Sequence, residues 1–191
     1  MSKMCWQSSL QRIIQKLPHA EPRLAVVGVG HELRGDDAAG VMVARQLLAL
    51  PQTDDNWLVL DGGQAPENCT GPLRRFAPDL VILVDAAALN LTPGDIQLLT
   101  WQQIGGLSAS THTLPLHLLA RYLIAELNCE VILIAIQPDD TSLGAPLSPL
   151  VQSAVEEVGR VIERLRDLEI ERVETAHSTP VPGTKPSNRF S

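Results

Sequence analysis

The apolar residues of this chain fall into short segments that alternate between two spacings. Compact apolar runs, typical of strands buried on both faces, lie at 23–30, 57–60, 80–84 and 131–136. A fifth strand is expected over 96–101, after the turn signal Pro93-Gly94. Apolar positions recur at helical spacing over 38–50, 114–127 and from Pro149 to about 168.

Strands that alternate with helices and are apolar throughout predict an α/β protein. We expect a largely parallel sheet that helices cover on both faces. The predicted parts are a helical lead-in over 1–20, one α/β domain over 21–170 and a disordered polar tail over 171–191.

Composition and charge narrow the class of protein. The 191 residues are 45% hydrophobic and carry a net charge of −7, which suits a globular monomer and disfavours nucleic acid or an anionic membrane as partner. No apolar run approaches the roughly 18–20 residues that span a bilayer, and no signal-peptide pattern is visible. Cys5, Cys69 and Cys129 are odd in number and widely spaced, so we expect reduced thiols in a cytoplasmic protein.

Polar side chains follow several of the predicted strands, where open α/β sheets bind their ligands. Asp36 and Asp37 come after the first strand, Asp61 ends the second, and Asp85 ends the third. His112 stands just before the helix predicted from Leu114.

Two interpretations of these groups remain open on spacing alone. Asp37, Asp85 and His112 form an O, O, N ligand set that suits a divalent transition-metal ion with open coordination positions. In the structural interpretation, Asp37 caps a helix, Asp85 fixes a loop and His112 bonds a helix start. Asp61, directly before two glycines, is then a residue that fixes a turn.

The Gly28-Val-Gly30 loop suggests a nucleotide-dependent enzyme, but the surrounding residues argue against it. The dinucleotide-binding fingerprint needs a third glycine where this chain has Leu33. Asp36 and Asp37 would also repel a phosphate at the start of the following helix.

No pattern for a protein nucleophile or a resident zinc ion is readable either. The chain lacks a Gly-x-Ser-x-Gly elbow and a His-Glu-x-x-His helix, and its cysteines have no adjacent base. If the chain is a hydrolase, it must therefore activate water.

Five blocks in order resemble the nickel-iron hydrogenase maturation proteases. The stretch Val27-Gly-Val-Gly-His-Glu-Leu-Arg-Gly-Asp-Asp-Ala-Ala-Gly40 resembles the opening signature of that family. The blocks at 60–67, 84–86, 111–116 and 136–138 follow in the family's order. Asp61-Gly-Gly-Gln-Ala-Pro-Glu67 and Ile136-Gln-Pro138 are most similar to the branch that serves hydrogenase 3, the formate hydrogenlyase enzyme.

The resemblance implies an endopeptidase, classed with the aspartic-type peptidases. Its implied fold is a three-layer αβα arrangement with a mostly parallel, twisted sheet, similar to phosphorylase and hydrolase folds. Such an enzyme removes a carboxyl-terminal extension from the precursor of the hydrogenase large subunit after nickel insertion. The family's metal-contacting residues fall on Asp37, Asp85 and His112, with Asp61 and His31 as secondary candidates. The nickel is carried by the substrate and is not expected to be a resident metal.

His31 departs from the family signature, which usually has Asn there. An Asn side chain bonds neighbouring backbone in a tight loop, and we expect His31 to make that bond instead. The departure keeps one rival in view, a chaperone of the same precursor that senses nickel without cutting.

Overall fold

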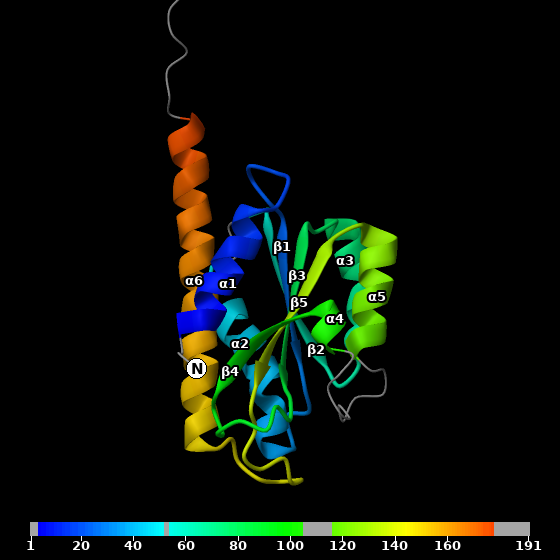
Figure 1. The fold of residues 1–191 in the computed structure, drawn as a ribbon, viewed down its shortest axis with the longest axis vertical. Coiled ribbons are helices and arrows are strands. Elements are labelled where there is room, and N and C mark those ends of the chain that lie inside the picture. The colour runs from blue at the N-terminus through cyan, green and yellow to red at the C-terminus, as the bar shows by residue number, and fades with distance from the viewer. Residues whose placement is uncertain (1–3, 52–53, 105–115, 178–191) are drawn as a thin grey trace, which may run out of the picture.

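A computed structural model describes residues 4–51, 54–104 and 116–177, and its centre is a five-stranded sheet (Figure 1). The strand order is β2-β1-β3-β5-β4. Strands β1 (Leu24–Val29), β2 (Trp57–Gly63), β3 (Leu80–Ala86) and β5 (Glu130–Ile136) are parallel, and β4 (Ile96–Thr100) runs antiparallel to β5. The predicted, mostly parallel sheet is confirmed.

Helices cover both faces of this sheet, which confirms the three-layer arrangement (Figure 1). On one face lie α1 (Met4–Gln15), α2 (Ala39–Leu48) and α6 (Pro149–His177). On the other lie α3 (Thr70–Phe76), α4 (Trp101–Ile104) and α5 (Leu116–Leu127).

Side chains of the central strands alternate between two apolar cores. In β3, Ile82 and Val84 pack against the α2 and α6 side, whereas Val81 and Leu83 pack against the α5 side. All four are fully buried. Burial on both faces explains why these strands are continuous apolar runs in the sequence.

The ends of the chain differ in part from expectation. The predicted lead-in forms helix α1, whose Trp6 and Leu10 are buried in the core shared with α2 and α6. Helix α6 runs past the predicted end near 168 to His177, since no proline or glycine interrupts the sequence there. The rest of the expected tail, 178–191, lies outside the described residues.

Three local elements were predicted imperfectly or not at all. The fifth strand ends at Thr100, and Trp101 already begins α4. Helix α3 was not predicted, since its seven residues include Gly71 and Pro72.

Among the described residues, no helix is long and apolar enough to span a membrane.

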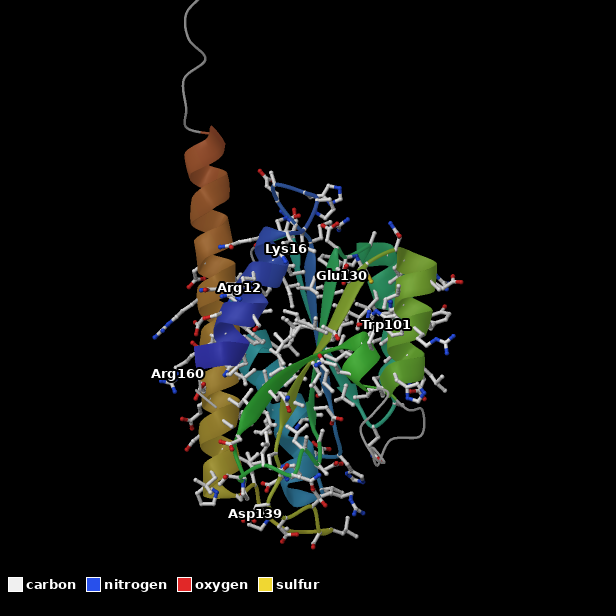
Figure 2. All side chains as sticks on the ribbon, in the orientation of Figure 1. Arg12, Lys16, Trp101, Glu130, Asp139 and Arg160 are labelled. Atoms are coloured by element: carbon white, nitrogen blue, oxygen red, sulfur yellow. The ribbon has the colours of Figure 1, made fainter. Side chains whose placement is uncertain are left out.

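The parallel strands give the sheet two unlike edges. We call the edge where β1, β2, β3 and β5 begin the amino edge, and the edge where they end the carboxyl edge. Figure 2 labels Glu130, the first residue of β5, near one end of the molecule, and Asp139, just beyond β5, near the other.

Candidate functional site

The loop after β1 folds back tightly on a short 3-10 helix, η1 (Gly35–Ala38), which carries Asp36 and Asp37. Gly30 has a φ of +145°, and a Cβ placed on it would lie 1.8 Å from the Asp37 carbonyl oxygen. Only glycine fits there. Two buried carboxylates thus stand before α2, where a dinucleotide enzyme would place a phosphate.

Backbone hydrogen bonds orient the Asp37 side chain. Its Oδ2 accepts a bond from the His31 N–H at 3.0 Å, and the same N–H reaches the Asp37 carbonyl oxygen at 3.2 Å. Asp37 is only 3% exposed. A buried carboxylate held by backbone donors is positioned without side-chain rearrangement.

Asp85 lies at the end of β3, next to the start of α2. A Cβ on Gly40 would lie 2.0 Å from the Val84 carbonyl oxygen and 2.4 Å from that of Val29. Because glycine allows this close approach, η1 and the first turn of α2 rest directly on the ends of β1 and β3. The structure therefore brings Asp37 and Asp85, the latter 1% exposed, to the same part of the carboxyl edge.

Asp61 lies apart from Asp85. Register pairs Gly28 with both Asp61 and Val84, so Asp61 shares the face of Val84, and Asp85 points to the opposite face. Asp61 accepts a bond from the Gly63 N–H at 3.1 Å and pairs with Arg45 at 3.0 Å. These are the contacts of a residue that fixes a turn.

Arg45 links Asp61 to the loop after β1. It also pairs with Glu32 at 2.8 Å. Hydrogen bonds to Glu32 and then to Asp61 raise the pKa of the Arg45 guanidinium above its ordinary value, so this guanidinium stays charged.

His31 makes the loop bond expected of it. Its Nδ1 accepts a hydrogen bond from the Leu33 N–H at 3.2 Å. The substitution for Asn is thus explained by a local turn bond, the same one an Asn side chain makes.

His112 lies outside the described residues. Helix α5 begins at Leu116, four positions further on, and ends next to the amino edge, where β5 starts. The helix therefore begins toward the carboxyl edge. Within the ranges that the structure describes, no three His, Cys, Asp or Glu side chains are grouped to hold a metal ion.

Asp36 has a role that the sequence did not reveal. Its carboxylate accepts four hydrogen bonds from the loop between β5 and α6: the N–H groups of Asp139 (2.8 Å), Asp140 (3.0 Å) and Ser148 (2.7 Å), and the Ser148 hydroxyl (2.9 Å). Its own N–H donates to the Asp140 carbonyl oxygen at 2.9 Å. Asp36 is fully buried. We call its hydrogen bonds the Asp36 clamp, because they tie the loop after β1 to the loop after β5.

Beyond β2, the 3-10 helix η2 (Pro66–Cys69) places an acid and a thiol beside each other. Glu67 Oε2 is buried, and no hydrogen-bond partner reaches it among the described residues. Burial raises the pKa of the Cys69 thiol to about 11, and the charges of Asp61 and Glu67 add to that effect. A thiol with this pKa is protonated near neutral pH and is a poor nucleophile.

Comparison with known proteins identifies the family of this chain. Residues 41–165 match the model of the HycI family, described as hydrogenase maturation protease. The chain is 36% identical over 136 residues to the hydrogenase 3 maturation protease of Escherichia coli strain K12, covering 71% of this chain and 85% of that protein. It is 28% identical over 167 residues to a putative hydrogenase maturation protease of Methanocaldococcus jannaschii, covering 84% and 98%.

A solved structure shares the fold as well. The crystal structure of a [NiFe] hydrogenase maturation protease, HycI from Thermococcus kodakarensis, superposes with a TM-score of 0.70 at 33% identity, covering 78% of this chain and 96% of that one. The family model spans more than half of the chain, and the relative from Escherichia coli exceeds 30% identity over more than two thirds of it. The chain therefore belongs to the hydrogenase maturation proteases.

Proposed function

We propose that this protein is the endopeptidase that removes the carboxyl-terminal extension of a nickel-iron hydrogenase large-subunit precursor, of the hydrogenase 3 type, after nickel insertion. The observation that carries the proposal is the pair of buried carboxylates, Asp37 and Asp85, at the carboxyl edge of a chain of this family. The hydrogenase 3 assignment is supported by the relative from Escherichia coli, which is named for that enzyme.

In the proposed reaction, Asp37, Asp85 and His112 contact nickel that the precursor already holds through its own thiolates. Two carboxylates and one imidazole leave coordination positions for those thiolates. Three ligands of this kind bind a free ion less well than an ion that is already held by the substrate. With this incomplete set of ligands, the enzyme would bind a precursor that already holds nickel and would not bind one that lacks it.

Hydrolysis then requires an activated water molecule. In one route the substrate's nickel polarises the water or the scissile carbonyl group. In the other, a carboxylate acts as the general base, which gives the enzyme its aspartic-type character. The contacts of Asp61 with Arg45 and its own turn favour Asp37 over Asp61 as that base.

The protonated state of Cys69 supports a water-activating mechanism over thiol catalysis. We place the reaction in the cytoplasm, because Cys69 and Cys129 are free thiols. The monomeric state expected from the sequence stays a prediction.

Intact mass spectrometry of the precursor tests the proposal. We expect the purified protein to shorten the nickel-loaded precursor by one carboxyl-terminal peptide and to leave the nickel-free precursor at full length. Efficient cutting without nickel would contradict the role of the metal.

Binding without any loss of mass would support the alternative, a nickel-sensing chaperone. The substitution that suggested this alternative now has a local explanation, since His31 makes the turn bond with Leu33. For this reason we favour the endopeptidase.

A further inference from the structure

Two exposed leucines lie on adjoining loops at the carboxyl edge, near the candidate site. Leu33, in the loop after β1, is 61% exposed, and Leu143, in the loop after β5, is 71% exposed. They are the two most exposed large apolar side chains among the described residues. The Gly144 N–H donates to the Leu33 carbonyl oxygen at 2.7 Å, so the two backbones touch.

Both loops are held in place from beneath. The Asp36 clamp ties the loop after β1 to residues on either side of Leu143. The hydrogen bond from the Leu33 N–H to His31 Nδ1 also restrains the loop after β1 itself. An exposed apolar pair on restrained backbone loses little conformational entropy when it binds a partner.

The pair is continuous with the candidate site. His31, two positions before Leu33, gives its N–H to the Asp37 carboxylate. The loop that carries Leu33 therefore also donates a hydrogen bond to the Asp37 carboxylate. Scattered exposed apolar residues need no explanation, but a preorganised pair beside a site does.

Charges around the pair indicate the chemistry of the partner. Asp139 and Asp140 are exposed at the start of the same loop, and Figure 2 labels Asp139 at the bottom of the view, beyond the carboxyl edge of the sheet. A hydrogen bond from the Ser142 hydroxyl and one from its backbone lower the pKa of the Asp140 carboxyl. In the loop after β1, Glu32 is paired with Arg45, and Arg34, next to Leu33, carries one positive charge.

We propose that Leu33 and Leu143 form a docking surface for the precursor substrate, which takes an apolar side chain flanked by a lysine or arginine. The apolar side chain lies against the two leucines, and the basic group lies near Asp139 and Asp140. The inference rests on the proposed function, because the partner is the protein that is cut. It adds a substrate contact outside the nickel site.

Kinetics of precursor cleavage test this surface. We expect the double variant Leu33→Ser with Leu143→Ser to raise KM about tenfold and to leave kcat within about twofold, since a lost ground-state contact raises KM alone. The matched control is Leu48→Ser, which changes a leucine that is 41% exposed at the end of α2, away from the carboxyl edge. Circular dichroism checks that every variant is folded.

A second variant tests the basic part of the partner. Asp139→Asn keeps the backbone N–H that Asp36 binds and removes only the charge. We expect a two- to threefold rise in KM at low ionic strength that disappears at about 0.5 M salt, where exposed charges are screened. A rise that salt does not change, or no rise at all, would overturn the basic requirement.

The outcomes separate the two proposals. If the unaltered protein cuts the nickel-loaded precursor and the double variant has the same KM, the docking surface is wrong and the proposed function stands. If the unaltered protein does not cut it, both fail. If the unaltered protein is a dimer that the double substitution separates on size-exclusion chromatography, the leucines bind a second copy and the proposal is overturned.

Discussion

Among the described residues, the buried acidic side chains lie at the carboxyl edge of the sheet, and the amino edge holds a partly exposed one. At the amino edge, Asp79 remains partly exposed and pairs with His19 at 2.6 Å, while it accepts the Arg23 N–H at 2.8 Å. At the carboxyl edge, Asp36, Asp37 and Asp85 are all buried. Water can therefore still reach the Asp79 carboxyl group, whereas the other three carboxyl groups are solvated by protein atoms.

Burial of carboxylates is costly unless donors replace the lost water. Asp36 meets that need with backbone donors and a hydroxyl, and its charge holds loops together. Asp37 and Asp85 bring two buried carboxyl groups to the same part of the carboxyl edge. The comparison teaches that the acids we propose to contact the substrate's nickel are shielded from water, whereas the acid of the amino edge is not.

The largest effect should come from the two candidate site acids. We expect Asp37→Ala and Asp85→Ala to reduce precursor cleavage by at least about 100-fold, since removal of a catalytic or metal-contacting group typically costs 10²–10⁴-fold. The amino-edge control Asp79→Asn should cleave at the normal rate. Mass spectrometry of the precursor over time gives both rates, and equal rates in all three variants would abolish the distinction between the edges.

A smaller but still large effect is expected on stability. Asp36→Ala removes a fully buried carboxyl group that accepts four hydrogen bonds, and it leaves the donors of the loop after β5 without that partner. We expect it to lower the free energy of unfolding by about 3–5 kcal/mol, the range for breaking a buried charged network. Urea denaturation measures this value, and a loss under 1 kcal/mol would show that the clamp does not hold the loops.

The same measurement on the amino edge should give a lesser loss. Asp79→Asn keeps a side-chain oxygen for the Arg23 N–H and removes the charge that faces His19, a pair that is two-thirds exposed on the histidine side. We expect a loss of about 0.5–1 kcal/mol, as for exposed ion pairs. A loss as large as that of Asp36→Ala would erase the contrast between the two edges.

The smallest effect concerns two thiols, one toward each edge. Burial raises the pKa of Cys69, beside the carboxyl edge, and of Cys129, just before β5, to about 11 in each case. Because a raised pKa keeps the thiol protonated until the pH approaches that value, both should react with iodoacetamide at pH 8 at least about 100-fold more slowly than a free cysteine. Alkylation should accelerate as the pH rises, as peptide mass spectrometry can follow.

Substitution of each thiol completes this test. Cys69→Ala and Cys129→Ala should both cleave the precursor within about twofold of the unaltered rate, because neither thiol is ionised at neutral pH. Loss of cleavage in the folded Cys69→Ala variant alone would point to thiol chemistry at the carboxyl edge.

Much of the fold could be predicted because the core strands are buried on both faces. Such strands are continuous apolar runs, so β3 and β5 were located from the sequence. Helix α3 escaped prediction because a short helix with Gly71 and Pro72 has little intrinsic helical preference. Its position depends on packing, for example of Leu73 in the core.

The sequence predicted which candidate site residues follow each strand, but not how those residues are arranged relative to one another. The rule that ligands bind at the ends of parallel strands selected Asp37 and Asp85, and the structure places both at one edge. Sequence could not separate Asp61 from them, because strand register decides which face each side chain occupies. Nor could it reveal the Asp36 clamp, whose partners are 103–112 residues further along the chain.

Because of the Asp36 clamp, the middle of the loop after β5 can be exchanged for another sequence without loss of its anchors. One carboxylate grips the chain at Asp139 and Asp140 and again at Ser148, so both ends of the segment 141–147 are anchored at a fixed separation. Insertions in such a loop cost little chain entropy. Grafting a different sequence between these anchors would give the enzyme a new outer surface while α6 and the acids of the carboxyl edge keep their places.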